Sequence, residues 1–252
     1  MPPPNDAPSL PAGAHLTGGC ISSAPLVQLL VTARSGYPWP RGTSASASQL
    51  IISRLEATVS HCLTGLNSIA ANQIVVDVSR WAGNNAKSHA LLVRATPAQQ
   101  AAMQAAITDL VTPGREHFGI DALCALPGIS LVIASKIFRF CAPQVGAAVD
   151  RHASYFFNSL PVVGRGMATT FRREWSNGRH TSSRLATFSP RSYADNRDHY
   201  FQSYLPVRGC IANALNAMPA QYNCAATNRM MNWTPADVEM AAYSWWACNG
   251  AR

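Results

Sequence analysis

The sequence lacks the features that would assign it directly to a metal-binding or disulfide-rich class. It has 7 cysteines, an odd number with scattered spacing, and no two of them form a Cys-x-x-Cys pair. Thiolate zinc sites use such closely spaced pairs, so we expect no zinc site here. Scattered, unpaired cysteines are typical of a reducing compartment, and we therefore expect a cytoplasmic protein.

Long apolar runs are missing as well. No apolar stretch reaches the roughly 20 residues of a membrane-spanning helix. The first residues, Met1-Pro2-Pro3-Pro4-Asn5-Asp6, contain no basic region followed by an apolar core, so we expect no secretory signal. Internal repeats are absent and alternating strand patterns almost so. The expected class is all-α.

Acidic residues are scarce. The chain has 12 Asp and Glu against 20 Lys and Arg, which gives a formal net charge of +8. A basic surface suits a polyanionic partner such as DNA or an anionic membrane. A soluble protein can also be basic without any such partner, so the net charge alone leaves the choice open.

A chain of 252 residues can form one large domain or two small lobes. Residues 1–22 are rich in Pro, Ala and Gly and predict an N-terminal arm on the surface. Residues 23–252 read as one helical domain. Apolar spacing, caps and turn residues predict helices at 24–34, from 46 to about 70, from 97 to about 111, at 115–126, from 131, at 151–160, after Pro190 and Pro206, and from 235. Residues 73–81 fit a strand or a helix, and their neighbours favour the helix.

One stretch organises the rest of the chain. A helix at 115–126 is followed by Leu126-Pro127-Gly128-Ile129, a tight turn in which Gly128 allows backbone angles closed to other residues. Ser130 is a good N-cap for the next helix, and Pro143 ends that helix. Asp150 is placed to cap the helix after it. The pattern predicts a helix, a hairpin turn, a helix and then a capping aspartate.

This stretch resembles the helix-hairpin-helix DNA glycosylases, the superfamily of endonuclease III, the adenine glycosylases and the 8-oxoguanine glycosylases. The residues that match the family pattern in order and spacing are Leu126-Pro127-Gly128-Ile129, Ala134, Pro143, Val149-Asp150 and His152. The match covers about 40 residues and centres on the hairpin. The resemblance implies two helical lobes with the active-site cleft between them.

The resemblance makes Asp150 the catalytic carboxylate. Cleavage of an N-glycosidic bond builds positive charge on the sugar, which a carboxylate stabilises while it orients or deprotonates an attacking water. Asp150 is also explained as a plain helix cap, and the two roles are compatible. His152 and Tyr155 follow it and are expected to line the base pocket, although His152 fits a structural role equally well.

The resemblance makes the hairpin a phosphate-binding element. Its backbone N–H groups would hold a DNA phosphate, in the family often with a bound monovalent cation. Gly128, Ile129 and Ser130 take that role here, although the family usually has a second Gly where this chain has Ser130. Basic residues that follow would neutralise further phosphates: Arg151, Arg165, Arg172 and Arg173. A solvated basic loop is the alternative.

Bifunctional members of the family carry a lysine at the position of Val132, which permits strand cleavage. Valine is no nucleophile, so the resemblance implies a monofunctional reaction that uses water. Lys136 lies one helical turn further along the same face. It is a candidate for a phosphate contact or a substitute amine, and otherwise a solvated or structural lysine.

Two further features concern cofactors and the base pocket. Some family members hold an iron–sulfur cluster on four cysteines near the C-terminus, but Cys210, Cys224 and Cys248 lack that close spacing, so we expect no cluster and no other cofactor. A flipped base also needs an aromatic pocket and a wedge. The aromatic candidates are Trp39, Trp81, Phe171, Trp175, Trp233, Trp245 and Trp246.

Three functions fit the sequence. The first is a monomeric DNA glycosylase that removes a damaged or modified base from double-stranded DNA and leaves an abasic site. The base would be an oxidised purine, as in DNA repair, or a hypermodified phage cytosine, as in antiviral defence. The second is a non-catalytic helix-hairpin-helix DNA-binding protein, which has no need of a carboxylate at Asp150. The third is a basic helical interaction protein unrelated to DNA.

Overall fold

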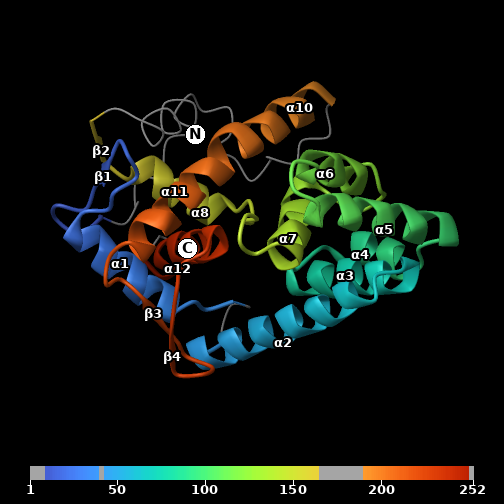
Figure 1. The fold of residues 1–252 in the computed structure, drawn as a ribbon, viewed down its shortest axis with the longest axis horizontal. Helices are drawn as coiled ribbons and strands as arrows, with labels where there is room; N and C mark the ends of the chain where they lie inside the picture. The colour runs from blue at the N-terminus through green and yellow to red at the C-terminus, as the bar shows by residue number, and fades with distance from the viewer. Residues whose placement is uncertain (1–8, 40–42, 165–189, 250–252) are drawn as a thin grey trace. The chain divides into compact units, whose positions relative to one another are not determined.

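The computed structural model describes residues 9–39, 43–164 and 190–249, and these are predominantly helical (Figure 1). The expected all-α class is confirmed. The helices are α1 (Ala24–Ser35), α2 (Ala45–Thr64), α3 (Ser68–Trp81), α4 (Ala86–Val93), α5 (Pro97–Val111), α6 (Glu116–Cys124), α7 (Leu131–Cys141), α8 (Arg151–Ser159), α10 (Pro190–His199), the π-helical turn η1 (Tyr200–Tyr204), α11 (Leu205–Asn216) and α12 (Pro235–Asn249).

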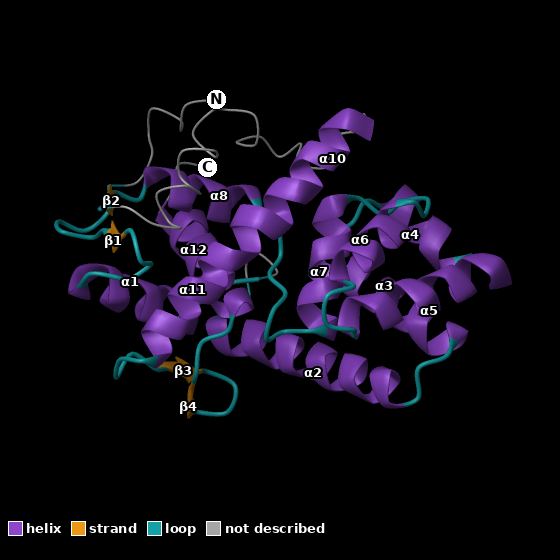
Figure 2. Ribbon diagram, turned by 45° about the horizontal axis from the view of Figure 1, so that its top comes forward, coloured by secondary structure: helices purple, strands orange, loops and turns teal. Residues whose placement is uncertain are grey.

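Four short strands complete the described residues. The strands β1 (Leu16–Thr17) and β2 (Val162–Val163) are parallel, whereas β3 (Tyr222–Cys224) and β4 (Arg229–Met231) form an antiparallel hairpin (Figure 2). Asn228 has a positive φ of 54° at the turn of that hairpin, a conformation that asparagine tolerates better than most residues.

The chain divides into two compact units. Unit 1 contains residues 1–49 and 149–252, and unit 2 contains residues 50–148. The helical region from residue 23 onward is distributed over both units. The hairpin helices α6 and α7 lie in unit 2, and Asp150 lies in unit 1.

Unit 2 is built around α3, α5 and α7. The buried face of α3 carries Ile74 and Val75, and α5 contributes Met103 and Ile107, all at most 1% exposed. Helix α7 is buried along almost its whole length, including its charged residues. Apolar residues three and four apart on each helix form these faces, which is the pattern the sequence showed.

Unit 1 is built around α12, which contacts α1, α8 and α11 (Figure 1). A buried ion pair joins α1 to α12: Arg34 Nε donates to Asp237 Oδ1 at 2.8 Å, and the Tyr222 hydroxyl donates to the same oxygen at 2.8 Å. Burial by itself would raise the pKa of Asp237, but Arg34, Thr234 and Tyr222 outweigh it and lower that pKa.

Two expectations from the sequence need correction. The helix expected from 46 to about 70 ends at Thr64, because Gly65 interrupts it and Asn67 caps α3 by accepting from the amides of Ile69 and Ala70. Residues 73–81 lie in α3, so the choice of helix was correct. The second half of the expected surface arm is part of unit 1, where Leu16 and Cys20 are at most 2% exposed.

Candidate functional site

The turn between α6 and α7 has the geometry that its glycine predicts. Gly128 has φ +84°, and a Cβ built there would lie 2.9 Å from the carbonyl oxygen of Ser88. Asn84 Nδ2 donates to the Gly128 carbonyl at 3.1 Å. The turn is therefore fixed against Asn84, which precedes α4, and Ser88 in its first turn, and any side chain at position 128 would be strained and crowded.

The first turn of α7 offers hydrogen-bond donors. Ser130 occupies the N-cap position, but its side chain makes no capping hydrogen bond. Among the described residues, no acceptor is bonded to the amides of Ser130, Leu131, Val132 and Ile133. Helix N-termini with open amides bind anions, because the N–H groups and the helix dipole both favour negative charge.

Sequence reasoning missed the residues that support this turn. Asn84 and Ser88 contact Gly128 from the α3–α4 corner, and Lys87 between them on the chain is exposed. The contact joins segments about 40 residues apart, which no local sequence pattern indicates, although Asn84-Asn85 was recognisable as a helix start.

Ile129 is held within the turn. Its side chain is buried, at 7% exposed, and its amide donates to the carbonyl of Leu126 at 3.3 Å within the turn. Neither group is directed to a partner outside the protein. Ile129 anchors the hairpin, and the donors at the turn belong to the residues that follow it.

Asp150 caps α8 as expected. Its Oδ1 accepts from the amide of His152 at 2.7 Å, and the side chain is half-buried. The other carboxylate oxygen, Oδ2, accepts no hydrogen bond from the described part of the chain. One oxygen is therefore held by the helix, while the second keeps its lone pairs for another donor.

A buried polar cluster borders Asp150 within unit 1. Arg208 is fully buried; its Nη1 donates to the Tyr204 carbonyl at 3.1 Å, and its guanidinium lies 3.2 Å from the Tyr204 ring centroid. Burial raises the pKa of Tyr204 far above its ordinary value, Glu239 and Asp150 raise it further, and Arg208 opposes them. The Arg208 guanidinium also lies 4.3 Å from the Phe157 ring centroid, so the cluster contacts α8.

Sequence reasoning did not single out Arg208 or Glu239. Each is a charge within an apolar helical stretch, Val207-Arg208-Gly209-Cys210-Ile211 and Val238-Glu239-Met240-Ala241. A charged residue at a position that the helical period assigns to the core signals a buried partner. That signal was present, but the partner's identity depends on how α11 and α12 pack.

His152 and Tyr155 lie on α8 among aromatic side chains. The His152 ring is edge-on to Tyr243 at 5.4 Å, and Tyr243 also contacts Tyr37 and Trp39 at 5.6 and 5.8 Å. Tyr155 lies 5.4 Å from Trp246. Trp39, one of the aromatic candidates for a base pocket, thus shares a cluster with His152, two residues from Asp150.

The other aromatic candidates have different surroundings. Trp81 contacts Phe140 in unit 2 at 4.9 Å, and Trp233 is buried and donates from Nε1 to the Ala220 carbonyl at 2.6 Å. Trp245 contacts Phe156 at 5.6 Å. Phe171 and Trp175 lie outside the described residues.

Lys136 is buried rather than solvated. It is 9% exposed, and its Nζ lies 5.9 Å from the Trp81 ring centroid. The neighbouring Arg139 lies 5.8 Å from the same ring and pairs with Glu56 at 3.2 Å. This burial corrects the alternative of a solvated lysine and leaves little of the side chain for a phosphate.

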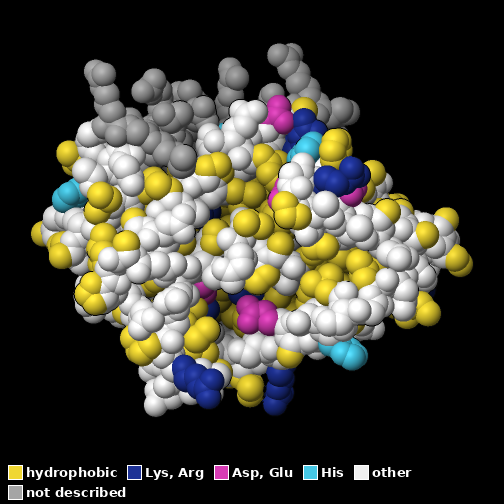
Figure 3. Space-filling view, in the orientation of Figure 1, with side chains coloured by type: hydrophobic (Ala, Val, Ile, Leu, Met, Phe, Trp, Pro, Cys, Tyr) yellow, Lys and Arg dark blue, Asp and Glu magenta, His cyan; other side chains and the backbone are white. Residues whose placement is uncertain are grey.

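Most of the arginines that were expected to contact DNA lie outside the part of the chain that the structure describes. Arg165, Arg172 and Arg173 lie outside the described residues, and of Arg151 only the backbone, as the first residue of α8, is described. On the face in Figure 3, the described Lys and Arg side chains are scattered and do not form one patch. The hairpin residues and Lys136 belong to unit 2, whereas Asp150, His152 and Tyr155 belong to unit 1.

The described ranges contain no group of three or more His, Cys, Asp or Glu side chains arranged to hold a metal ion. No helix within those ranges is long and apolar enough to cross a membrane. No protein-family model, curated protein or solved structure matches the chain.

Proposed function

We propose that this chain is a monofunctional DNA glycosylase, with Asp150 as its catalytic carboxylate and the α6–α7 hairpin as its phosphate-binding element. The observation that carries the proposal is the carboxylate of Asp150, of which only one oxygen is bonded within the described protein. Asp150 comes after the Gly128 turn in the chain, and the amides that follow that turn are without acceptors among the described residues. The net charge of +8 is consistent with a polyanionic substrate.

The proposed reaction breaks the bond between C1′ of the sugar and the base nitrogen. The bonding electrons leave with the base, and positive charge develops on the sugar ring. Asp150 stabilises that charge, and water adds to C1′ while its proton passes to a carboxylate oxygen or to the departing base. The products are a free base and an abasic site.

Val132 supports the hydrolytic form of the reaction. Without an amine at that position, no imine forms there and strand cleavage by β-elimination has no electron sink. Borohydride treatment during turnover is expected to trap no covalent protein–DNA adduct. If an adduct forms and Lys136→Ala abolishes it, Lys136 is the nucleophile and the monofunctional assignment is wrong.

The substrate is a base that is damaged or modified, either an oxidised purine or a hypermodified phage cytosine. The test is incubation with a panel of duplexes that carry these bases, phage genomic DNA included, followed by detection of alkali-labile abasic sites. We expect such sites in one member of the panel and none in unmodified DNA. The absence of abasic sites throughout would contradict the proposal.

The alternative is a non-catalytic DNA-binding protein, which the open N-terminus of α7 favours by itself. This protein would bind duplexes with strong salt dependence and release no base. Salt-dependent binding together with inactivity on the whole panel would select this alternative. Absence of DNA binding would exclude both functions.

A further inference from the structure

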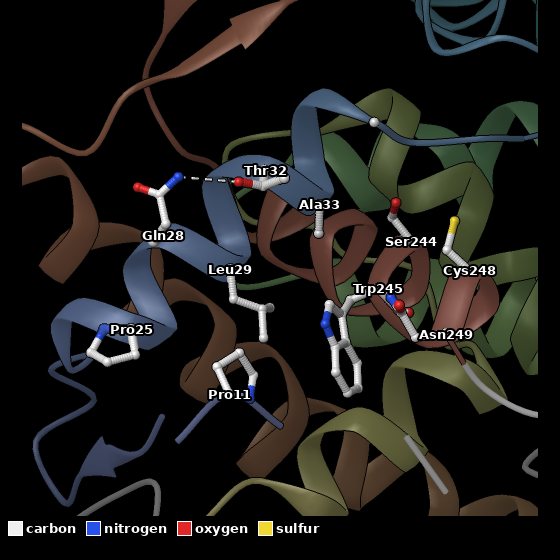
Figure 4. Close-up of a pocket in the computed structure, with 11 residues that line it drawn as sticks. Pro11, Pro25, Gln28, Leu29, Thr32, Ala33, Ser244, Trp245, Cys248 and Asn249 are labelled. Carbon is white, nitrogen blue, oxygen red and sulfur yellow. Dashed lines mark hydrogen bonds between the residues drawn. The ribbon is translucent and has the colours of Figure 1, made fainter. Parts of the chain in front are cut away.

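Unit 1 contains a cavity of about 610 Å³ between α1 and the second half of α12, a volume typical of small-molecule sites (Figure 4). Helix α1 lines it from Pro25 to Ala33 together with Gly36 just beyond the helix, and α12 lines it from Ser244 to Asn249. Figure 4 shows Pro11, Leu29 and Trp245 facing a common space. The cavity involves neither Asp150 nor the hairpin.

The chemistry of the walls selects the ligand. No described residue that lines the cavity is charged, and the apolar walls come from prolines, Leu29, Ala33 and the Trp245 indole. A charged ligand would lose its hydration there without a counter-charge. A flat, neutral molecule would retain its apolar contacts and stack on the indole.

One polar group inside the cavity has no partner in the described protein. Ser244 is 2% exposed, and its hydroxyl makes no hydrogen bond with any described residue. A serine within a helix can bond the carbonyl one turn earlier, and no such bond is made by Ser244 among the described residues. Gln28 at the rim is partly engaged, since its Nε2 donates to Thr32 Oγ1 at 3.2 Å. The Ser244 hydroxyl is left to bond a ligand.

We propose that this cavity binds a neutral, mainly apolar aromatic molecule that hydrogen-bonds to Ser244. The site is separate from the proposed DNA activity and holds whether or not DNA is a substrate. A ligand wedged between α1 and α12 would stabilise unit 1 by mass action, since the unfolded chain has no such cavity.

The test uses Nile red, a neutral aromatic dye that fluoresces in apolar surroundings. Wild-type protein is expected to bind it saturably at one site. Thr32→Trp fills the mouth of the cavity from an exposed position and should weaken binding about tenfold or more, and Gln28→Trp should do the same. Ala24→Trp, an exposed residue of α1 outside the lining, is the matched control and should leave binding unchanged.

Two further measurements separate the site from general surface binding. Ser244→Ala should weaken Nile red about fivefold through the loss of one hydrogen bond. Bound dye should slow alkylation of Cys248, which is exposed and lines the cavity, but not of half-buried Cys62 in unit 2.

Three results would overturn the proposal. The first is the absence of saturable binding by the wild type. The second is equal binding by wild type, Thr32→Trp and Gln28→Trp when all three melt cooperatively. The third is a dimer that Thr32→Trp converts to a monomer in light scattering, which would show that a second copy of the chain covers the cavity.

Discussion

The first turns of α7 and α12 differ in how their backbone amides are satisfied. At α12, Asp237 Oδ2 accepts from the amide and the hydroxyl of Thr234 at 2.9 and 2.6 Å, while Asp237 Oδ1 accepts from Arg34 and Tyr222. At α7, Ser130 makes no side-chain cap. The hydrogen-bonded start of α12 stabilises unit 1, whereas the uncapped start of α7 leaves amide donors for an anion.

The start of α8 is intermediate between α7 and α12 in how many of its hydrogen-bonding groups have partners. Asp150 uses one carboxylate oxygen for the amide of His152, and among the described residues nothing donates to the other. A fully engaged carboxylate such as Asp237 cannot assist a reaction without breaking its network. Asp237 therefore has a structural role, whereas Asp150 keeps one oxygen for the catalytic role proposed for it.

The largest expected effect is on catalysis at α8. Asp150→Asn keeps a side-chain acceptor for the helix start but removes the negative charge beside the developing sugar cation. The rate of base excision should fall by roughly three orders of magnitude or more, about 4 kcal/mol in the barrier, with DNA affinity retained. Single-turnover kinetics measure the loss, and full activity in a folded Asn variant would remove Asp150 from the mechanism.

The next effect is on stability at α12. Asp237→Ala leaves Arg34 buried without its partner and should lower the free energy of unfolding by about 3–5 kcal/mol. Urea denaturation measures it. Arg115→Met is the matched control, because it breaks an equally short pair, Arg115–Asp109, whose arginine is exposed and contributes little.

A double variant sharpens this prediction. Arg34→Met combined with Asp237→Leu removes both charges and should be more stable than Asp237→Ala alone. If the double variant is the less stable of the two, the cost lies in packing around α1 and α12 rather than in an unpaired charge.

At α7, Gly128→Val should weaken binding to all duplexes alike, roughly tenfold, because phosphate contacts carry little sequence information. Gly114→Val is the matched control: Gly114 also has a positive φ, +82°, but open space around its Cβ position. Both variants carry backbone strain, so both should be destabilised, and only the first should lose affinity. Equal affinity in the two folded variants would make the hairpin a structural turn.

The smallest effect is the pH dependence of the α12 start. The folded-state pKa of Asp237 is lowered, so its contribution to stability is present above the ordinary aspartate pKa of about 3.9 and is lost as the pH falls through the folded value. The difference in unfolding free energy between wild type and Asp237→Asn should shrink below about pH 4. A difference that grows on acidification would contradict the ion pair as its source.

Local sequence signals predicted most of the helix starts. Thr96-Pro97, Asp150 and Thr234-Pro235 each begin a helix as expected, because caps act within one turn of the chain. The break after Thr64 was missed, since apolar residues at helical spacing continue across Gly65 and the N-cap at Asn67 was not weighed against them.

Long-range partners were beyond sequence reasoning. Arg34 and Asp237 are 203 residues apart, and Gly128 meets Asn84 across 44 residues. Such pairs depend on how helices pack, which helical periodicity does not specify. The helix cap at Asp150 and the turn at Gly128 could be predicted because each depends on a few neighbouring residues of the chain.

The most direct test of an anion site at α7 is a backbone amide NMR titration with a short DNA duplex, repeated at increasing salt. The amides of Ser130, Leu131, Val132 and Ile133 should shift on addition of DNA and return as salt rises. Those of Thr234 and Asp237, already bonded within the protein, should not move. Unchanged amides at α7 while DNA is bound, or equal shifts at both helix starts, would contradict the assignment.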